Sequence, residues 1–207
     1  MQKEPFVTVI TPTIRGREEL VERCRESVRQ QTLSASDLIH WVKEDEHGYG
    51  PALLRDHMLM RVQTPWVSFL DDDDEFMPGH LEVMLDAAQR TRADYLYSWY
   101  EVVGGTDPRP DEFGLPWNDA EPRQTTITTL VRTRLAQRVG GFSLTGEDEV
   151  DDLDDPSRVF HGEDWRFTLR CLDAGAKIYH LPVKTWYWHH HGRNTSGLPK
   201  NARRLYS

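Results

Sequence analysis

The stretch WVSFLDDDDEFMPGHL, residues 66–81, places a short apolar run directly before four consecutive aspartates, Asp71–Asp74. A run of this length with polar residues on both sides is typical of a buried strand. From Pro78 onward the spacing of Leu81, Met84 and Ala88 predicts a helix with one apolar face. Since ligands of open α/β sheets bind beyond the carboxyl ends of the strands, the four carboxylates are predicted to face a ligand site.

Strands and helices are predicted to alternate on both sides of this stretch. Strands are expected at 6–11, 38–44, 64–70 and 93–103, and helices at 18–31, 50–62 and 78–91. This alternation predicts an α/β fold with a mainly parallel central sheet flanked by helices. Beyond residue 104 the pattern is less regular, with a Pro- and Gly-rich connection, a helix within 162–177 and a strand-like segment at 178–192. We interpret the acidic run 147–155 as a solvated loop.

Composition narrows the class of protein. With 207 residues, 38% hydrophobic and 29% charged, the chain is expected to form a single globular domain. Its net charge of −9 lacks the basic surface of a nucleic-acid-binding protein, so no direct nucleic-acid partner is expected. Cys24 and Cys171 are interpreted as reduced core thiols. No apolar stretch reaches the length of a membrane span, and we expect a cytoplasmic protein.

The aspartate run has the chemistry of a divalent-metal site. If the strand pleat continues, Asp71 and Asp73 project to one side, and Asp72 and Asp74 to the other. Ligation by oxygen alone suits Mg²⁺ or Mn²⁺. In the alternative interpretation, Asp72, Asp74 and Glu75 are solvated or cap the helix that begins near Pro78.

Three further segments are predicted to reach the same sheet edge. The loop after the first strand could hold a nucleotide with its backbone and an arginine. The acidic segment after the second strand could hydrogen-bond a base or ribose, and an arginine on the helix before the third could reach a phosphate. The residues concerned are Thr11, Pro12, Thr13 and Arg15 or Arg17 in the loop, Glu44 and Asp45 in the acidic segment, and Arg55 on the helix. Each feature alone is weak, since a helix arginine is usually a surface residue.

The sequence resembles the family-two glycosyltransferases with the GT-A fold, which is a Rossmann-like fold. Four blocks carry the resemblance: TVITPT with the downstream ESVRQQT, the aspartate stretch as a D-x-D segment, VGGF at 139–142, and GEDWRFTLRCLDAG leading to HHHGRNTS. They run in order through nearly the whole chain. The resemblance implies a nucleotide-binding half at about 1–103 and a smaller, irregular acceptor and catalytic half at about 104–207.

The resemblance also implies roles for single residues. The donor would be a nucleoside diphosphate sugar, with a UDP-sugar expected first. Asp73 would bind the metal, Asp71 would lie nearer the ribose, and Asp72 would also belong to the donor side; this register is open by one residue. His191 would approach the metal or diphosphate, with Arg193 and Ser196 close behind. Asp164, beside Glu163, would be the general base of an inverting transfer, although both acids could instead cap the helix that they begin.

Several alternatives stay open at this point. The acceptor could be a glycan, a protein or a small molecule, and the short chain favours transfer of a single sugar. Ile14-Arg15 and the segment EDEH, residues 44–47, depart from the family pattern around the nucleobase. Rival functions are a Mg²⁺-dependent phosphohydrolase or nucleotidyltransferase, which would also use clustered aspartates, and a non-catalytic sugar-nucleotide-binding module. The oligomeric state is left undefined.

Overall fold

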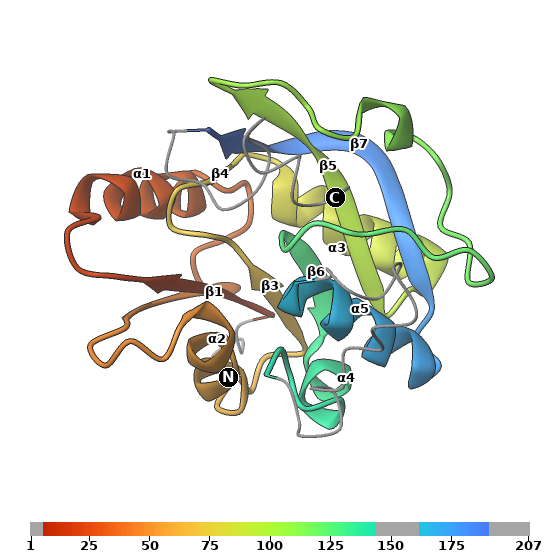
Figure 1. Cartoon of the computed structure of the whole chain (residues 1–207), viewed down its shortest axis with the longest axis horizontal. Helices are drawn as coiled ribbons and strands as arrows, with labels where there is room; N and C mark the ends of the chain where they lie inside the picture. Colours follow the sequence, from red (N-terminus) through yellow and green to blue (C-terminus); the bar gives the residue numbers. More distant parts are fainter. Residues whose placement is uncertain (1–5, 144–161, 191–207) are drawn as a thin grey trace, which may run out of the picture.

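The computed structural model describes residues 6–143 and 162–190. Within these ranges the chain forms one seven-stranded sheet and its covering helices (Figure 1). The elements are β1 (Val7–Thr13), α1 (Glu18–Arg29), β2 (Leu38–Glu44), α2 (Pro51–Leu59), β3 (Trp66–Phe69), β4 (Glu75–Phe76), α3 (His80–Thr91), β5 (Tyr95–Val103), the short 3₁₀ helix η1 (Pro110–Glu112), β6 (Thr129–Arg132), α4 (Thr133–Arg138), α5 (Glu163–Asp173) and β7 (Ile178–His189).

The sheet has the strand order β2-β1-β3-β6-β5-β7-β4. β1 is parallel to β2 and β3, and β5 is parallel to β7. β6 lies antiparallel between β3 and β5, and β4 is antiparallel to β7. Five strands therefore share one direction, which confirms the predicted α/β fold with a mainly parallel sheet; the two reversed strands were not predicted.

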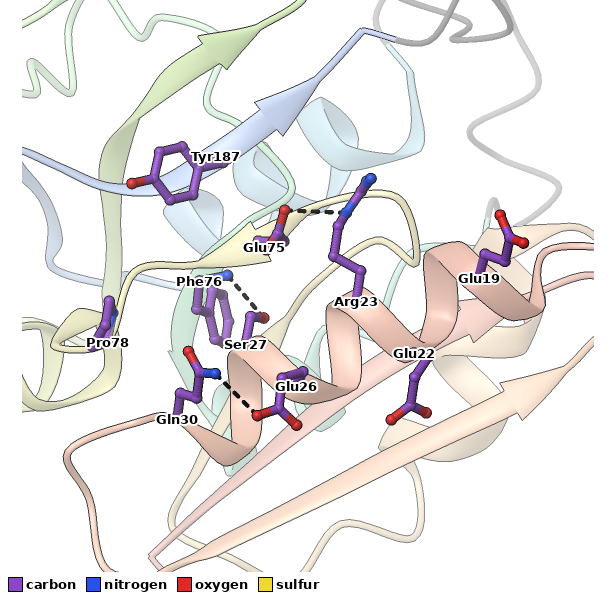
Figure 2. Close-up of a pocket in the computed structure, with 10 residues that line it drawn as sticks. All are labelled: Glu19, Glu22, Arg23, Glu26, Ser27, Gln30, Glu75, Phe76, Pro78 and Tyr187. Atoms are coloured by element: carbon purple, nitrogen blue, oxygen red, sulfur yellow. Dashed lines mark hydrogen bonds and ion pairs between the residues drawn. The ribbon is translucent and has the colours of Figure 1, made fainter.

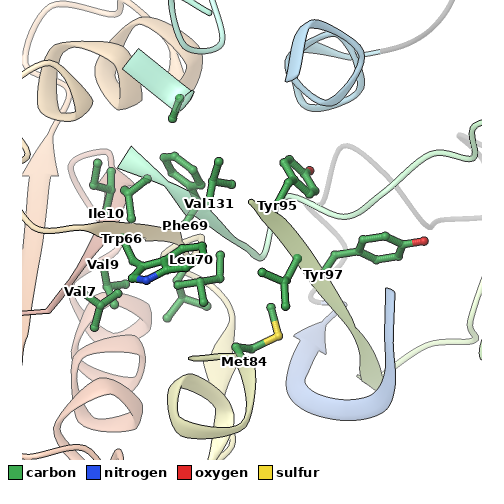
Figure 3. Packing of buried hydrophobic residues seen from close by; sticks show 14 of the residues in the cluster. Val7, Val9, Ile10, Trp66, Phe69, Leu70, Met84, Tyr95, Tyr97 and Val131 are labelled. Atoms are coloured by element: carbon green, nitrogen blue, oxygen red, sulfur yellow. The ribbon is translucent and has the colours of Figure 1, made fainter. Parts of the chain in front are cut away.

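Helices cover both faces of the sheet. Seen along the sheet, α1 and α3 lie on one side of the strands, and α2 and α5 lie on the other (Figures 1 and 3). On α1 the buried positions Cys24 and Val28 are four residues apart, as the predicted apolar face requires. Both cysteines are buried and free, in agreement with the sequence-based expectation.

A single core joins the early and late parts of the chain. Phe69 at the end of β3 packs edge-on against Phe142, with ring centroids 4.8 Å apart, and against Phe167 of α5 at 5.9 Å. All three side chains are almost fully buried. Figure 3 shows Phe69 beside Val131 and near Tyr95, so β3, β5, β6 and α5 share this packing. The position of α5 over the sheet is thereby fixed by aromatic burial.

The VGGF segment forms a turn that is fastened to α2. The Asp56 carboxylate accepts the backbone N–H groups of Phe142 at 2.6 Å and Ser143 at 2.7 Å. Gly141 has a φ of +76°, and a Cβ there would lie 2.0 Å from Asp56 Oδ1. Only glycine combines this conformation with so close an approach. The turn thus ties the segment after α4 to the helix that carries Arg55.

In the part of the chain that the structure describes, every helix is too short or too polar to cross a membrane.

Candidate active site

The four aspartates form a turn and do not continue β3. The strand ends at Phe69, and the Asp74 N–H donates to the Asp71 carbonyl at 3.2 Å. This turn brings one carboxylate oxygen each of Asp71, Asp73 and Asp74 within 4.8 Å of one another. The pairing of Asp71 with Asp73 is as predicted, but the reason is the turn and not a continuing pleat. A three-carboxylate cluster results.

The structure corrects the interpretation that Asp74 and Glu75 are solvated or cap the following helix. Asp74 is 3% exposed and accepts the backbone N–H of His189 at 3.0 Å. Glu75 is partly buried and pairs with Arg23 at 3.1 Å and with His189 Nε2 at 2.6 Å. The N-cap of α3 is Gly79, with no side-chain cap. Antiparallel pairing of β4 with β7 turns both acids inward, which their local sequence does not indicate.

Asp72 points away from this cluster, toward the loop after β1. Its carboxylate accepts a hydrogen bond from Thr13 Oγ1 at 2.5 Å and one from Arg17 Nη1. Arg17 Nη2 also reaches Asp73 Oδ2 at 3.3 Å. Arg15 is exposed. Of the two arginines that the sequence offered, the structure therefore brings Arg17 to the acidic turn; adjacent arginines in a loop give no local signal for which one turns inward.

Ionisation of all the carboxyl groups in the acidic turn is unfavourable. Burial raises the pKa of the Asp74 carboxyl well above its usual range, and the neighbouring Asp73 and Asp71 raise it further. Burial likewise raises the pKa of Asp71 and Asp72, while Arg55 opposes the shift at Asp71, and Thr13 and Arg17 oppose it at Asp72. Clustered carboxyl groups do not all ionise readily without a nearby positive charge. A hard divalent cation such as Mg²⁺ or Mn²⁺ supplies that charge and prefers oxygen ligands.

Arg55 connects the acidic turn with α5. Its side chain is 3% exposed and comes from the buried face of α2. Nη2 lies 2.5 Å from Asp71 Oδ1, and Nη1 lies 3.2 Å from Glu163 Oε1 and 3.7 Å from Asp164 Oδ1. These contacts bring three of the predicted site carboxylates to one guanidinium. The phosphate contact that the sequence suggested for Arg55 stays a prediction.

Asp164 lies in the first turn of α5, with a third of its side chain exposed. The N-cap of α5 is Gly162, and neither Glu163 nor Asp164 makes a side-chain cap bond. Burial raises the pKa of Asp164 to about 7; Arg55 lowers it, and Glu163 and Asp71 raise it. A carboxyl group with a pKa near neutrality is suited to accept a proton at physiological pH.

Three hydroxyl groups anchor the backbone beneath Asp164. Thr168 Oγ1 donates to the Asp164 carbonyl at 3.0 Å. The same hydroxyl lies 2.8 Å from Tyr95 OH and 2.8 Å from Thr125 Oγ1, and Tyr95 and Thr125 are 3.0 Å apart. The buried triangle links α5 to β5 and to the connection before β6. Nothing in the spacing of these residues pointed to it.

The ends of β1 and β2 form the other side of the site. Glu44 and Asp45 line a cavity of about 480 Å³ together with Lys43, Glu46, His47, Tyr49, Leu53, Leu54 and His57. The Asp45 carboxylate accepts the N–H groups of His47, Tyr49 and Gly50, and so folds the loop over this cavity. Thr11 and Pro12 are buried, and the Thr11 hydroxyl faces His40 Nε2 at 3.0 Å.

A separate groove of about 700 Å³ runs between α1 and β4 (Figure 2). Its walls include Glu19, Glu22 and Glu26 of α1 and Tyr187 of β7. The groove touches the acidic turn through Arg23, which pairs with Glu75 and donates to the Asp73 carbonyl at 2.6 Å. None of the predicted site residues lines it. Arg23 itself was missed by sequence reasoning, because on α1 it reads as one of several surface arginines.

Several predicted features lie outside the described residues. They are His191, Arg193 and Ser196, and the acidic run 147–155.

Comparisons with known proteins agree with the fold. Residues 36–134 match the model of Glycosyl transferase family 2. TarS residues 1–349 from S. aureus, solved with UDP, superpose with a TM-score of 0.70 at 18% identity, over 97% of this chain and 63% of that one. The same TarS fragment with UDP-GlcNAc gives a TM-score of 0.71 at 18% identity, over 91% and 60%.

A mannosyltransferase from Pyrobaculum calidifontis, in complex with GDP-Man and Mn²⁺, gives a TM-score of 0.68 at 15% identity, over 93% of this chain and 59% of that one. The chain thus spans about three fifths of the length of these structures. A search of curated proteins found no significant match. The matched family segment begins after β1 and ends before VGGF, so it includes the aspartate run and Arg55 but not Asp164. The match over residues 36–134 supports the resemblance to the family-two glycosyltransferases, and the shared fold confirms the predicted GT-A fold.

Proposed function

We propose that this protein transfers a single sugar from a nucleoside diphosphate sugar to an acceptor hydroxyl, with inversion at the anomeric carbon. The observation that carries the proposal is the gathering of the acidic turn and Asp164 around Arg55. One side of the site then offers carboxylates for a metal-bound diphosphate, and the other offers one carboxylate for a proton. A single displacement uses a metal to stabilise the leaving diphosphate and a base to take the proton of the acceptor hydroxyl.

On the donor side, Asp71, Asp73 and Asp74 would hold Mg²⁺ or Mn²⁺, with His191 as a further candidate ligand. The metal, when bound, would neutralise the negative charge that develops on the departing diphosphate. Arg17, held by Asp72 and Asp73, adds a positive charge at the same edge. Thr13 and Asp72 would lie along the ribose, and the cavity lined by Glu44 and Asp45 would take the nucleobase.

On the acceptor side, Asp164 would take the proton of the acceptor hydroxyl as the oxygen attacks the sugar C1. The new bond from C1 to the acceptor oxygen forms while the bond from C1 to the diphosphate oxygen breaks, and the diphosphate leaves with that electron pair. Glu163 is placed beside Asp164, where its charge favours the protonated form of the base. The acceptor itself could be a glycan, a protein or a small molecule.

A UDP-sugar is the first donor to test, because UDP and UDP-GlcNAc are bound by TarS; a GDP-sugar is the second, because the mannosyltransferase binds GDP-Man. A panel of both, with Mn²⁺ and a set of sugar and peptide acceptors, would be followed by mass spectrometry. We expect an acceptor that gains the mass of one sugar, and loss of about 10²–10⁴-fold in rate for Asp164→Asn.

Free sugar with nucleoside diphosphate, and no glycosylated acceptor, would instead support a phosphohydrolase-like activity. Donor binding with no turnover of any kind would support a non-catalytic binding module. Either result overturns the proposal. Determination of the anomeric configuration of the product by NMR tests inversion separately.

A further inference from the structure

Arg55 is a buried cation whose partners all carry proposed catalytic or donor-side roles. We propose that Arg55 is a positioning residue that fixes the Asp164 carboxylate relative to the acidic turn, and that it does not bind the donor phosphates. This inference rests on the proposed function, since it concerns the same site. It gives Arg55 a role that sequence alone did not suggest.

Burial of Arg55 favours a structural role. Arg55 is 3% exposed, and transfer of an unpaired guanidinium out of water is strongly unfavourable. An arginine guanidinium stays protonated in proteins, so its buried charge must be balanced by Asp71, Glu163 and Asp164. If it turned toward a phosphate, these partly buried carboxylates would lose their counter-charge.

The guanidinium of Arg55 spans the acidic turn and α5. One terminal nitrogen, Nη2, donates to Asp71 Oδ1, and the other, Nη1, donates to Glu163 Oε1 and lies within ion-pair distance of Asp164 Oδ1. Because the guanidinium is planar and rigid, its two nitrogens set the distance between the acidic turn and the first turn of α5. A lysine ammonium is a single point of charge and cannot set that distance in the same way.

Arg55 is itself held in place by neighbouring groups. Its guanidinium carbon lies over the Phe142 ring, 5.4 Å from the centroid. Its neighbour Asp56 binds the backbone N–H groups of Phe142 and Ser143. The helix, the aromatic ring and the VGGF turn thus restrict the side chain before it meets any ligand. The VGGF turn therefore supports the site indirectly, because it helps to hold Arg55 in place.

The backbone and the side chain of Asp164 are restricted by different groups. The Thr168 hydroxyl holds the Asp164 carbonyl, so the backbone is anchored by the hydroxyl triangle. This anchor does not restrict the side-chain torsions of Asp164. Arg55 Nη1, 3.7 Å from Asp164 Oδ1, is the described cation that limits them. Misplacing a base by about 1 Å is enough to slow a displacement about 10²-fold.

The test separates a positioning role from phosphate binding by comparing kcat with donor KM. Arg55→Lys and Arg55→Met would be assayed with saturating acceptor and Mn²⁺. We expect kcat to fall about 10²-fold, with donor KM within about threefold of the wild-type value. In the Asp164→Asn background the same substitutions should have little further effect, because the group they position is gone.

Arg132→Met is a matched control. Arg132 also lies over an aromatic ring, with its guanidinium carbon 4.2 Å from the Trp66 centroid, and it also pairs with an aspartate, Asp94 at 3.8 Å. It stands at the end of β3 opposite to the acidic turn. Its kcat and donor KM should match those of the wild type. Thermal melts of every variant identify those that have merely lost the fold.

A rise of tenfold or more in donor KM, with kcat retained, would show that Arg55 binds the donor and would overturn the inference. If the wild-type protein transfers no sugar, the proposed function fails, and crystal structures of wild type and Arg55→Lys decide the positioning role alone. A displaced Asp164 carboxylate, by about 1 Å or more, supports it. An unmoved carboxylate contradicts it.

Discussion

The Asp164 carboxyl group is exposed to opposing influences. Burial and the adjacent Glu163 favour its protonated form, whereas Arg55 favours the carboxylate. The result is a pKa of about 7, far from that of a solvated aspartate. A single acid in such surroundings should leave a signature in both rate and stability.

The first signature is the pH dependence of transfer. Since a general base must be deprotonated, the rate should rise with pH through about 7 and level off above it. Measurement of kcat/KM from pH 5 to 9 at saturating Mn²⁺, over roughly two units on each side, checks this. A profile that is already flat at pH 5 would mean that Asp164 titrates as an ordinary carboxyl and that its surroundings do not tune it.

The second signature is stability. A raised folded-state pKa means that protonation favours the folded form, so the ionisation of Asp164 between its ordinary pKa of 3.8 and about 7 destabilises the protein. Asp164→Asn should therefore raise Tm at pH 8 by about 2–4 °C, which is roughly 1 kcal/mol, while it slows transfer about 10²–10⁴-fold. At pH 4 the two proteins should melt together. A lower Tm for the variant at pH 8 would refute this account.

At the scale of elements, the VGGF turn shows how a backbone requirement supports the site. Gly141 adopts a conformation that is strained for other residues and lies against the Asp56 carboxylate. Gly140 also has a positive φ, of +81°, but a Cβ there would meet nothing within 4 Å. A side chain at Gly140 would therefore cause backbone strain alone, whereas one at Gly141 would cause both strain and a steric clash.

We expect Gly141→Ala to lower the free energy of unfolding by about 3 kcal/mol, because it combines strain with loss of the Asp56 contacts. Gly140→Ala should cost about 1–2 kcal/mol, from strain alone. Urea denaturation monitored by circular dichroism measures both values. Equal losses for the two variants would indicate that the Asp56 approach contributes nothing.

The acidic turn marks the limit of sequence-based prediction for elements. The apolar spacing on α1 and the alternation of strands and helices are local patterns, and the structure confirms them. The pleat assumed for Asp71–Asp74 failed because the chain turns, so that Asp74 joins Asp71 and Asp73. Whether a run of like residues continues a strand depends on contacts from β7 and α1, more than a hundred and about fifty residues away respectively.

At the scale of the whole molecule, one sheet and one core extend through both halves of the chain. The reversed strand β6 was not predicted because its place between β3 and β5 is set by long-range pairing, which periodicity does not encode. The family resemblance could assign Asp164 a role, but only the structure shows that the Arg55 guanidinium joins Asp164 to the acidic turn. A ligand that binds this site should therefore stabilise the whole fold.

We expect UDP with Mn²⁺, at about 100 times the Kd, to stabilise the protein by roughly 2.7 kcal/mol, or about 5–10 °C in Tm. Chelation by EDTA should remove most of this shift, because three buried or half-buried carboxylates would no longer be neutralised. Differential scanning fluorimetry makes the comparison, with Asp73→Ala as the variant that should not respond to Mn²⁺. A metal-independent shift of the same size would contradict the proposed metal site.

The short strand β4 has a consequence for the order in which the molecule is built. β4 follows the acidic turn directly, yet its ladder partner is β7, where Glu75 and Phe76 face Tyr187 and Trp186. During synthesis the aspartates leave the ribosome more than a hundred residues before the strand that secures them. A nascent chain that has already folded β1, β2 and β3 can pair Asp71, Asp72 and Asp73 with Arg55, Thr13 and Arg17, whereas Asp74 and Glu75 gain their His189 partner only when β7 arrives.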